Sequence, residues 1–276
     1  MIRPNKVVSI ILPVFNGEGF IYDAISSVLH QSYHDWELLV VNDGSEDSTE
    51  MIIQTLDDER IRYFYQDKRG VSAARNLGLE LMTGDYFCFL DGDDIMPEDS
   101  LKARLNVFQQ QPDVSFVDGA VLYMNDDMTP TGKHYIPSFT GYPYDELLNL
   151  NRKCYFGNTW MIKRETDINY RFNEEMTHAE DLFFYLTIAK GRQYSYTEIP
   201  VLYYREREKS AMKDLVGLEN GYFHLLRKVK EELQTDPTTF NVLKKRIIRI
   251  MFLSHLFDGC NPYNAVRSVF RFLTEA

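Results

Sequence analysis

The stretch FCFLDGDDIMPEDSL, residues 87–101, joins an apolar run to a cluster of acidic side chains. Its first four residues are apolar, and the next four include the three carboxylates of Asp91, Asp93 and Asp94. A short, unbroken apolar run is typical of a strand that is covered on both faces, as in a parallel sheet. Three neighbouring carboxylates repel one another unless a positive charge lies beside them. The stretch therefore predicts a buried strand that ends at a site for a cation.

Strands and helices alternate on both sides of this stretch. Apolar runs and helical spacing of apolar residues give the following order. Strands are expected at residues 7–14, 36–41, 61–65, 85–90 and 114–117, and helices at 18–31, 47–56, 71–82 and 97–110. The links between them are short. Such alternation is typical of an open α/β sheet that is mostly parallel and has right-handed crossovers.

Polar side chains follow three of these strands. Asn16 follows the first strand, Asp43 the second, and Asp91–Asp94 the fourth. In open α/β sheets, ligands bind at the carboxyl ends of the strands. We therefore expect these residues to meet at one edge of the sheet.

The regular alternation ends near residue 120. Residues 120–145 predict a hairpin and loops, and the rest of the chain predicts the following elements. These are a strand at 157–163, a helix at 179–190, a strand pair at 194–204 broken at Pro200, and helices at 215–234, 240–257 and 263–273. We expect one main domain at residues 1–210, with halves 1–118 and 119–210, and a helical extension at 211–276.

The charge of the chain is uneven. Residues 1–210 hold 20 basic and 34 acidic side chains, whereas residues 211–276 hold 10 and 7. An acidic body is a poor binder of nucleic acid, because neutralising phosphates requires Lys and Arg. We therefore expect no nucleic-acid partner.

Cysteine content and hydropathy indicate the compartment. Cys88, Cys154 and Cys260 are far apart in the sequence and form no CxxC motif, which argues against a disulfide framework or a structural zinc site. The apolar run near the N-terminus is about eight residues long, too short for a span of roughly 20. We expect a cytoplasmic protein.

The chemistry of the acidic cluster favours a divalent cation. Carboxylate oxygens suit Mg²⁺ or Mn²⁺, and Mg²⁺ typically takes one or two carboxylates and fills its other positions with water and substrate phosphate. The alternative is a helix N-terminus that attracts negative charge. That alternative accounts for Asp94, Glu98 and Asp99, but not for Asp91 and Asp93 at the strand end.

Two further segments have both a functional and a structural interpretation. In VVNDGSEDST, Asp43 at a strand end is suited to accept a hydrogen bond from a nucleobase, although Asn-Asp-Gly-Ser is also ordinary turn chemistry. In RGVSAARNLGL, the planar guanidinium of Arg75 is suited to contact a base or a phosphate, although a surface helix arginine is the simpler interpretation.

Together, four segments resemble the family 2 glycosyltransferases, which have the GT-A fold. The resemblance covers residues 7–118 closely and depends on motifs in a fixed order. These are Pro13-Val14-Phe15-Asn16, Val41-Asn42-Asp43-Gly44-Ser45, Arg69-Gly70 with Ala74-Arg75-Asn76-Leu77-Gly78, and Leu90-Asp91-Gly92-Asp93-Asp94. Each motif alone is a weak signal, whereas four in order are a strong one. Asn42 stands where many members carry Asp.

The resemblance implies a nucleotide-sugar donor, usually linked to UDP. It implies that Asp43 and Arg75 contact the uracil, that Asp91 lies near the ribose, and that Asp93 binds Mn²⁺ or Mg²⁺ on the diphosphate. The first motif implies that Pro13, Phe15 and Asn16 also belong to the nucleotide-sugar site.

The resemblance also implies a catalytic base at Glu180-Asp181. An inverting transfer needs a carboxylate to take the proton of the acceptor hydroxyl, and Asp181 is assigned that role. Glu180 is placed on the acceptor side. The simpler interpretation is charge compensation at a helix N-terminus.

Two later segments are assigned to the site with less specificity. In VLYYREREKSAM, Arg205 and Ser210 are candidates to face the donor phosphates, although the segment also fits a solvated run of charge. In FGNTWMIKR, Trp160 is a candidate to stack on the acceptor sugar, although tryptophans are more often found in the core.

The main expectation is a metal-dependent, inverting glycosyltransferase that transfers sugar to a hydroxyl of a saccharide or lipid-linked acceptor in polysaccharide or glycan synthesis. One alternative is a nucleotide-sugar-binding module without catalysis. Another is a phosphatase of the haloacid dehalogenase type, in which an Asp-any-Asp motif follows the first strand. Here the motif follows the fourth strand.

The C-terminal segment raises a separate hypothesis about location. The cluster Lys244-Lys245-Arg246 and Arg249 lies next to apolar residues such as Ile247 and Met251. Such a helix is suited to contact an anionic membrane surface on its cytoplasmic side. The alternative is that the apolar residues pack on the domain while the basic ones flank them. Self-association is a further option that the sequence leaves open.

Overall fold

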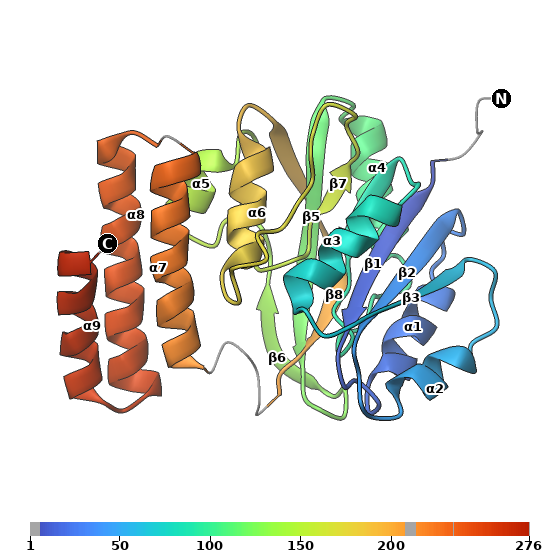
Figure 1. The fold of residues 1–276 in the computed structure, drawn as a ribbon. Coiled ribbons are helices and arrows are strands. Elements are labelled where there is room, and N and C mark those ends of the chain that lie inside the picture. Colours follow the sequence, from blue (N-terminus) through green and yellow to red (C-terminus); the bar gives the residue numbers. More distant parts are fainter. Residues whose placement is uncertain (1–5, 208–213, 234, 276) are drawn as a thin grey trace.

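The computed structural model describes residues 6–207, 214–233 and 235–275 (Figure 1). Within these ranges one sheet contains the strands β1 (Val8–Val14), β2 (Trp36–Asp43), β3 (Ile61–Gln66), β4 (Tyr86–Phe89), β5 (Val114–Met124), β6 (Pro130–Tyr135), β7 (Met161–Lys163) and β8 (Gln193–Arg205). The helices are α1 (Ile21–Leu29), α2 (Thr49–Gln54), α3 (Val71–Leu81), α4 (Ser100–Gln110), α5 (Tyr144–Leu148), α6 (Glu180–Ala189), α7 (Leu215–Glu232), α8 (Pro237–Leu253) and α9 (Pro262–Glu275). The strand order is β3-β2-β1-β4-β7-β5-β6, and β8 pairs with β5.

The first half of the chain forms the predicted alternation of strands and helices. β1 pairs in parallel with β2 and β4, and β2 pairs in parallel with β3. Every residue of β1, β2 and β4 is buried, which explains why these strands are mostly apolar. Phe87 and Phe89 belong to the core on one face of the sheet, and Tyr86 and Cys88 to the core on the other. The predicted buried strand at 85–90 is therefore confirmed.

Two helices begin three residues later than predicted. α1 begins at Ile21, not at residue 18, and α4 begins at Ser100, not at residue 97. The carbonyl of Pro97 accepts bonds from the Ser100 amide at 2.9 Å and from Gln31 Nε2 at 2.7 Å. Pro97 thus belongs to the turn that precedes the helix.

The second half of the sheet is mixed. β5 runs antiparallel to β6 and β7, and parallel to β8. The predicted pair of strands at 194–204 is wrong, because β8 is one long strand. The register between β5 and β8 shifts on either side of Ala120, which lies opposite Pro200. An irregularity at this point accommodates a proline, which cannot donate to the ladder, without ending the strand.

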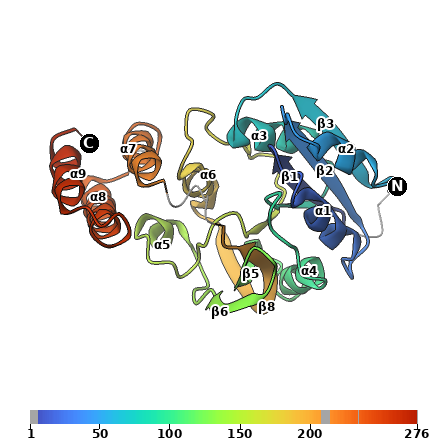
Figure 2. The same cartoon turned by 90° about the horizontal axis from the view of Figure 1, so that it is seen from below.

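The two faces of the sheet carry separate apolar cores. α1 and α4 pack on one face with β1, and their buried residues include Ile25 and Leu105. α3 and α6 cover the other face, where Leu79 and Phe184 are buried. Figure 2 shows α1 and α4 on the opposite side of the sheet from α3. The site at the strand ends is thus held by elements that are packed on both sides.

The chain after residue 213 forms helices, as predicted. α7, α8 and α9 lie side by side, beyond α6 and away from the sheet (Figures 1 and 2). α8 begins at Pro237, because Asp236 accepts bonds from the amides of Thr238 and Thr239, both at 3.0 Å. A π-helical turn, Ser254–Asp258, follows α8.

The helical extension shares the core of the main domain. Leu225, Leu243 and Phe272 belong to the same apolar cluster as Phe183 of α6. The predicted boundary at residue 210 lies outside the described residues, so the division into domains stays a prediction.

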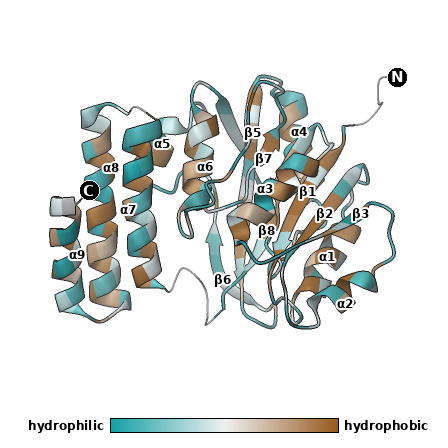
Figure 3. Cartoon of the chain, viewed as in Figure 1, coloured by the Kyte–Doolittle hydropathy of each residue, from teal (hydrophilic) through white to brown (hydrophobic). Residues whose placement is uncertain are grey.

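Hydropathy separates the sheet from the helical extension. Figure 3 shows hydrophobic residues concentrated along β1 and β2, whereas α7 and α8 carry both hydrophobic and hydrophilic positions. No helix in the described part of the chain combines the length and the apolarity needed to cross a bilayer.

Candidate active site

The loops that follow β1 and β2 are bonded to each other. The amide of Asn16 donates to Ser45 Oγ at 2.9 Å, and Asn16 Oδ1 accepts from the Glu46 amide at 2.9 Å. Asn16 has a φ of 50°, a left-handed conformation that Asn tolerates better than most residues. Phe15 is exposed beside it, with the ammonium of Lys68 3.8 Å from the centre of its ring. The structure therefore brings Phe15 and Asn16 to the predicted edge, whereas Pro13 is buried within β1.

Asp43 supports the loop that leads into α3. One carboxylate oxygen accepts from the Arg69 amide at 2.8 Å, and the other accepts from the Gly70 amide at 2.8 Å. Gln66 also donates to the first oxygen at 2.6 Å. Gly44 follows with a φ of 72°, and a Cβ there would lie 2.8 Å from the Lys68 amide, so this turn requires glycine. Asp43 thus fixes the loop between β3 and α3 at the end of β2, and it is 4% exposed.

Three arginines surround the acidic cluster. Asp91 pairs with Arg75 at 2.9 Å, and Asp93 pairs with Arg207 at 2.9 Å. The Nε of Arg205 donates to the main-chain carbonyl of Asp93 at 2.9 Å. The main-chain amide of Arg205 donates to the side chain of Asp94, also at 2.9 Å. The positive charge that the sequence requires beside these carboxylates is therefore provided, at least in part, by the protein.

The three carboxylates have different environments. Asp94 is buried, and burial together with the charges of Asp93 and Asp91 raises its pKa well above the usual range. The side chains of Asp91 and Asp93 are 43% and 34% exposed. Helix α4 starts after Asp99, so the N-terminus interpretation does not explain Asp94.

Two exposed carboxylates fit a divalent cation that completes its shell with water and phosphate. The described residues contain no group of three or more His, Cys, Asp or Glu side chains arranged around one metal position. Asp91 and Asp93 therefore suit a cation that binds together with a substrate diphosphate, and not a closed protein cage.

Arg75 connects the acidic cluster to α6. Its guanidinium pairs with Asp91 and, at 2.9 Å, with Glu180 at the start of α6. When the side-chain amide of Asn158 is oriented with its oxygen toward Arg75, that oxygen accepts from both terminal guanidinium nitrogens, at 3.2 and 2.8 Å. Burial by itself lowers the pKa of Arg75, but the charges of Asp91 and Glu180 outweigh it and raise the pKa. The arginine is therefore a fixed cation that brings two separate acidic segments together.

Asp181 lies next to Glu180 at the same helix start. Burial and the charge of Glu180 raise the pKa of Asp181 to about 6, although hydrogen bonds from Tyr155 and from the Leu182 amide act in the opposite direction. Ala179, which precedes the helix, has a φ of 57°, a strained conformation for alanine that turns the chain into α6. Asp181 is thus a carboxylate with a pKa close to neutral pH, one residue from a side chain that Arg75 holds.

Arg205 does not face an open phosphate site. Its side chain is 4% exposed and bonds to the carbonyls of Asp93 and Asp126, with Asp23 at 3.5 Å. The expectation that Arg205 contacts donor phosphates is corrected in this respect, because its guanidinium is occupied in shaping the turn at Asp93. Arg207, two residues further on, is half-buried and does reach the Asp93 carboxylate. Ser210 lies outside the described residues.

Trp160 is a core residue, and its predicted stacking on an acceptor sugar is wrong. The side chain is 0% exposed and stacks on Tyr185 at a ring distance of 4.1 Å. Its indole nitrogen donates to the carbonyl of Cys154 at 2.9 Å. Its ring face packs on Tyr185 and its polar atom is bonded inside the protein, so Trp160 belongs to the core.

The structure adds three side chains to those that the sequence predicted. Arg207, Asn158 and Tyr155 contact Asp93, Arg75 and Asp181, respectively. Only Arg207 had a signal in the sequence, as part of a charged run. Tyr155 and Asn158 lie in a loop segment whose contacts depend on the packing of β7 and α6.

Comparison with known proteins decides the family. The model of Glycosyl transferase family 2 matches residues 9–171, more than half of the chain. The chain belongs to this family. The matched region contains the acidic cluster and Arg75, and it stops before Glu180. Membership leaves the phosphatase alternative without support.

Two curated relatives match over most of the chain. The glucosyltransferase WfgD of Escherichia coli, named for transfer from UDP-Glc to GlcNAc-diphosphoundecaprenol, is 33% identical over 69% of this chain and 73% of its own. TuaG of Bacillus subtilis, named as a putative teichuronic acid biosynthesis glycosyltransferase, is 35% identical over 67% of this chain and 73% of its own. These names support the assignment of this protein as a glycosyltransferase.

Solved structures confirm the GT-A fold. TarS 1–349 of S. aureus, in complex with UDP-GlcNAc, superposes with a TM-score of 0.67 and 18% identity over 98% of this chain and 81% of that one. The mannosyltransferase PcManGT of Pyrobaculum calidifontis, in complex with GDP-Man and Mn²⁺, gives 0.60 and 19% over 98% and 76%. At these identities the likeness concerns the fold alone.

Proposed function

We propose that this glycosyltransferase transfers a sugar from a UDP-sugar, with inversion, to a hydroxyl of a saccharide or lipid-linked acceptor. One observation carries the proposal. Arg75 binds both Asp91, at the end of β4, and Glu180, at the start of α6. The predicted donor edge and the predicted base therefore belong to one cluster of side chains.

Asp181 acts as the general base in this proposal. An inverting transfer requires a carboxylate that takes the acceptor proton while the diphosphate leaves from the opposite face of the sugar. A pKa raised to about 6 leaves Asp181 ionised at neutral pH and makes it a stronger base than an ordinary aspartate. Arg75 holds the adjoining Glu180, which fixes the start of α6.

Asp93, with Asp91 beside it, would hold Mn²⁺ or Mg²⁺ together with the donor diphosphate. When bound, the cation supplies positive charge to the leaving diphosphate. Arg207 already pairs with Asp93 and adds a second positive charge at this edge. The uracil would lie against Phe15 and the loop that Asp43 fixes, and the ribose near Asp91.

The acceptor belongs to polysaccharide or glycan synthesis in this proposal. Support comes from the names of the relatives, since WfgD is named for a lipid-linked acceptor and TuaG for teichuronic acid synthesis. Neither name identifies the sugar that this protein transfers.

A panel of nucleotide sugars tests the proposal. UDP release from each donor is measured with Mn²⁺, with Mg²⁺ and with a chelator. We expect release with at least one UDP-sugar and a metal, and Asp93→Asn to reduce it about 10²-fold or more, because the cation loses a ligand at the diphosphate.

Asp99→Asn is the matched control, since Asp99 belongs to the same acidic segment but lies at the start of α4, where it accepts from Ser32. Its UDP release should stay near that of the unchanged protein. An Asp93→Asn protein with unchanged, metal-stimulated release would refute the metal assignment. UDP binding without release from any donor would instead favour a binding module.

We also propose that the helical extension contacts the cytoplasmic face of an anionic membrane, through α9 and not through the stripe predicted on α8. Ile247 and Met251 of α8 are buried, so that stripe packs on the domain. α9 instead presents exposed apolar side chains at helical spacing. They are Tyr263, Val266, Phe270 and Leu273. α8, which packs against α9, exposes basic residues that match anionic lipid. They are Lys245, Arg246 and Arg249.

Flotation with vesicles tests this contact. The protein should float with vesicles that contain anionic lipid, and Val266→Ser/Phe270→Ser should reduce the bound fraction several-fold because it removes apolar area from the interface. Met51→Ser, at an equally exposed apolar position on α2, is the matched control. No flotation, with a concentration-dependent dimer instead, would assign the α9 face to a second copy of this chain.

A further inference from the structure

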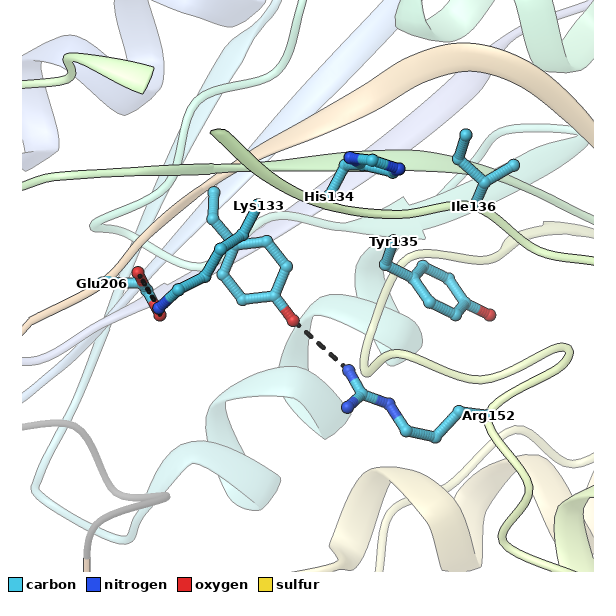
Figure 4. Close-up of a pocket in the computed structure, with 7 residues that line it drawn as sticks. Lys133, His134, Tyr135, Ile136, Arg152 and Glu206 are labelled. Atoms are coloured by element: carbon cyan, nitrogen blue, oxygen red, sulfur yellow. Dashed lines mark hydrogen bonds and ion pairs between the residues drawn. The ribbon is translucent and has the colours of Figure 1, made fainter. Parts of the chain in front are cut away.

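The open depression beside the β5–β6 hairpin has charged side chains that already have partners (Figure 4). Lys133 pairs with Glu206 at 3.0 Å, and Arg152 donates to the hydroxyl of Tyr123 at 3.3 Å. This surface therefore gives no reason to assign a ligand to it. The segment before α6 makes a more specific contact, because it meets the helical extension next to the proposed base.

The turn that precedes α6 has a strained backbone. Ala179 adopts a φ of 57° and a ψ of 17°, a left-handed conformation that is unfavourable for a residue with a Cβ. Such a conformation persists only where the surrounding structure imposes it. Because Glu180 and Asp181 follow directly, whatever holds Ala179 also sets the direction in which the Asp181 carboxylate points.

Two glycines of α7 contact the residue before this turn. Gly217 and Gly221 are about one helical turn apart, so they lie on the same face of α7. A Cβ at Gly221 would lie 2.5 Å from the Cβ of His178 and 2.7 Å from its carbonyl oxygen. A Cβ at Gly217 would lie 2.4 Å from the Cε1 of the same histidine. The imidazole therefore lies along α7 between the two glycines, and the backbones of His178 and of the helix are in direct contact.

This contact explains why α7 contains the two glycines. Glycine inside a helix destabilises it relative to alanine, and the helical backbone at Gly217 and Gly221 does not itself require glycine. The space that His178 occupies does require it. The His178 side chain is 13% exposed, and within the described residues its Nε2 makes no hydrogen bond, with the Asp214 carboxylate 3.9 Å away. His178 is thus held by packing against α7 more than by bonds.

Further contacts join α7 to the same segment. In Figures 1 and 2, α7 lies directly beside α6. Lys228 of α7 pairs with Glu175, which precedes the strained turn, at 3.3 Å. Burial raises the pKa of Tyr222 to about 12, and the nearby charge of Asp181 adds to this effect. α7 therefore borders the base itself as well as the turn before it.

We infer that His178 and the Gly217–Gly221 face of α7 position the catalytic base. The helical extension holds the turn at Ala179 in its strained conformation, and it thereby directs the Asp181 carboxylate toward the acceptor hydroxyl. The inference rests on the proposed function, in which Asp181 is the base. It adds that the helical extension is part of the catalytic unit and that His178 is a positioning residue.

Gly221→Ala tests the inference. The added methyl group would take the place of the His178 backbone, so the turn must move. We expect kcat for transfer to fall about 10- to 100-fold, with UDP affinity kept within about twofold, because a small displacement of a reacting group slows the chemical step and not donor binding. Arg227→Ala, at an exposed position of α7, is the matched control and should leave kcat unchanged. An unchanged kcat in Gly221→Ala, or a parallel loss of UDP affinity, would overturn the inference.

A double-mutant cycle gives an independent test if Gly221→Ala fails to fold. Gly217→Ala should displace the imidazole, and His178→Ala removes the ring that is displaced. The Asp214 carboxylate also lies near the new methyl group, but it is 57% exposed and can rotate into solvent. The double variant should therefore have a higher kcat than Gly217→Ala alone, and the two losses should not add. Additive losses would show that the two positions act separately, against the inference.

The pH profile separates positioning from direct proton transfer. His178→Ala should lower transfer while its acid limb stays near the pKa of Asp181, about 6, because the titrating group is unchanged. Loss of this limb would assign the proton transfer to His178 itself and overturn the inference. Asp181→Asn is compared in the same assays. If Asp181→Asn keeps full transfer, the proposed base fails, whereas if it abolishes transfer and Gly221→Ala does not lower it, only the positioning role fails.

Discussion

Asp181→Asn is expected to reduce sugar transfer about 10²- to 10⁴-fold at neutral pH, the range typical of a lost general base. An amide cannot accept the acceptor proton, although it has the size of the carboxylate. UDP release in the presence of acceptor measures the loss. Titration with UDP should give an unchanged affinity, because Asp181 lies on the α6 side of the cluster and not at the donor edge.

The loss of activity should not be a loss of folding. Burial and Glu180 raise the pKa of Asp181 above its ordinary value, so the folded protein disfavours the charged form. A carboxyl group whose pKa is raised in the folded state reduces stability as pH rises above its ordinary value of 3.8. At neutral pH, Asp181→Asn removes that charge, and its melting temperature should equal or exceed that of the unchanged protein.

Asp118→Asn is a matched control for this change. Asp118 is fully buried in β5, and burial raises its pKa to about 6 as well. Its carboxylate accepts from the Gly119 amide and from the Tyr194 hydroxyl, outside the cluster around Arg75. Asp118→Asn should therefore keep transfer within a few-fold. Equal losses in both variants would show that Asp181 acts through the fold and not as the base.

The same pKa predicts the acid limb of the pH profile. The active form of Asp181 is the carboxylate, so transfer should decline as pH falls through about 6. A base with an ordinary aspartate pKa would keep its activity down to about pH 4. Values of kcat/KM between pH 4.5 and 8 distinguish these cases. A profile that stays level to pH 5 would contradict the assignment.

The fold could be predicted from the sequence because its signals are local. Residues 7–14 are apolar except for Ser9, and residues 86–90 are apolar or aromatic; this pattern has one simple explanation, a strand covered on both faces. The order of these strands and helices then brings Asn16 and Asp91 to one edge, by topology alone. β8 was mispredicted because the effect of Pro200 depends on the irregular register of a neighbouring strand, which no local pattern encodes.

The site could be predicted only in part, because its contacts join distant segments. Arg75 and Glu180 are 105 residues apart, and only the tertiary fold makes them partners. The sequence around a tryptophan looks the same whether the side chain lines a site or lies in the core. Trp160 lies in the core, where it stacks on Tyr185. The resemblance to the family placed Arg205 at the donor phosphates, whereas main-chain carbonyls bind its guanidinium instead.

The arginines also provide positive charge that the sequence of the acidic cluster had led us to expect from a cation. Arg75 neutralises Asp91, and Arg207 neutralises Asp93. A divalent cation at Asp93 must therefore compete with Arg207 or bind beside it, whereas Arg75 is buried and fixed. Because Arg75 pairs with Asp91 at the proposed donor edge and with Glu180 at the start of α6, its removal should affect both stability and the pH profile.

Arg75→Met is expected to destabilise the protein by about 3 kcal/mol or more, because removing one member of a buried ion pair leaves its partners uncompensated. Asp91 and Glu180 both lose their cation, and Glu180 is only 12% exposed. Arg75 also lowers the pKa of Asp181, so its loss should move the acid limb of transfer to higher pH. Denaturant unfolding measures the first effect, and the pH profile of the surviving activity measures the second.

Arg171→Met is the matched control, because Arg171 also pairs with two glutamates, Glu80 and Glu174, but is 52% exposed. Water solvates those charges, so Arg171→Met should lower the free energy of unfolding by less than about 1 kcal/mol. Adding Glu180→Gln to Arg75→Met should restore part of the lost stability, since it removes one of the carboxylates that lost its cation. If Arg75→Met costs no more than Arg171→Met and leaves the pH profile in place, Arg75 does not join the donor edge to the base, and the proposed mechanism loses its structural basis.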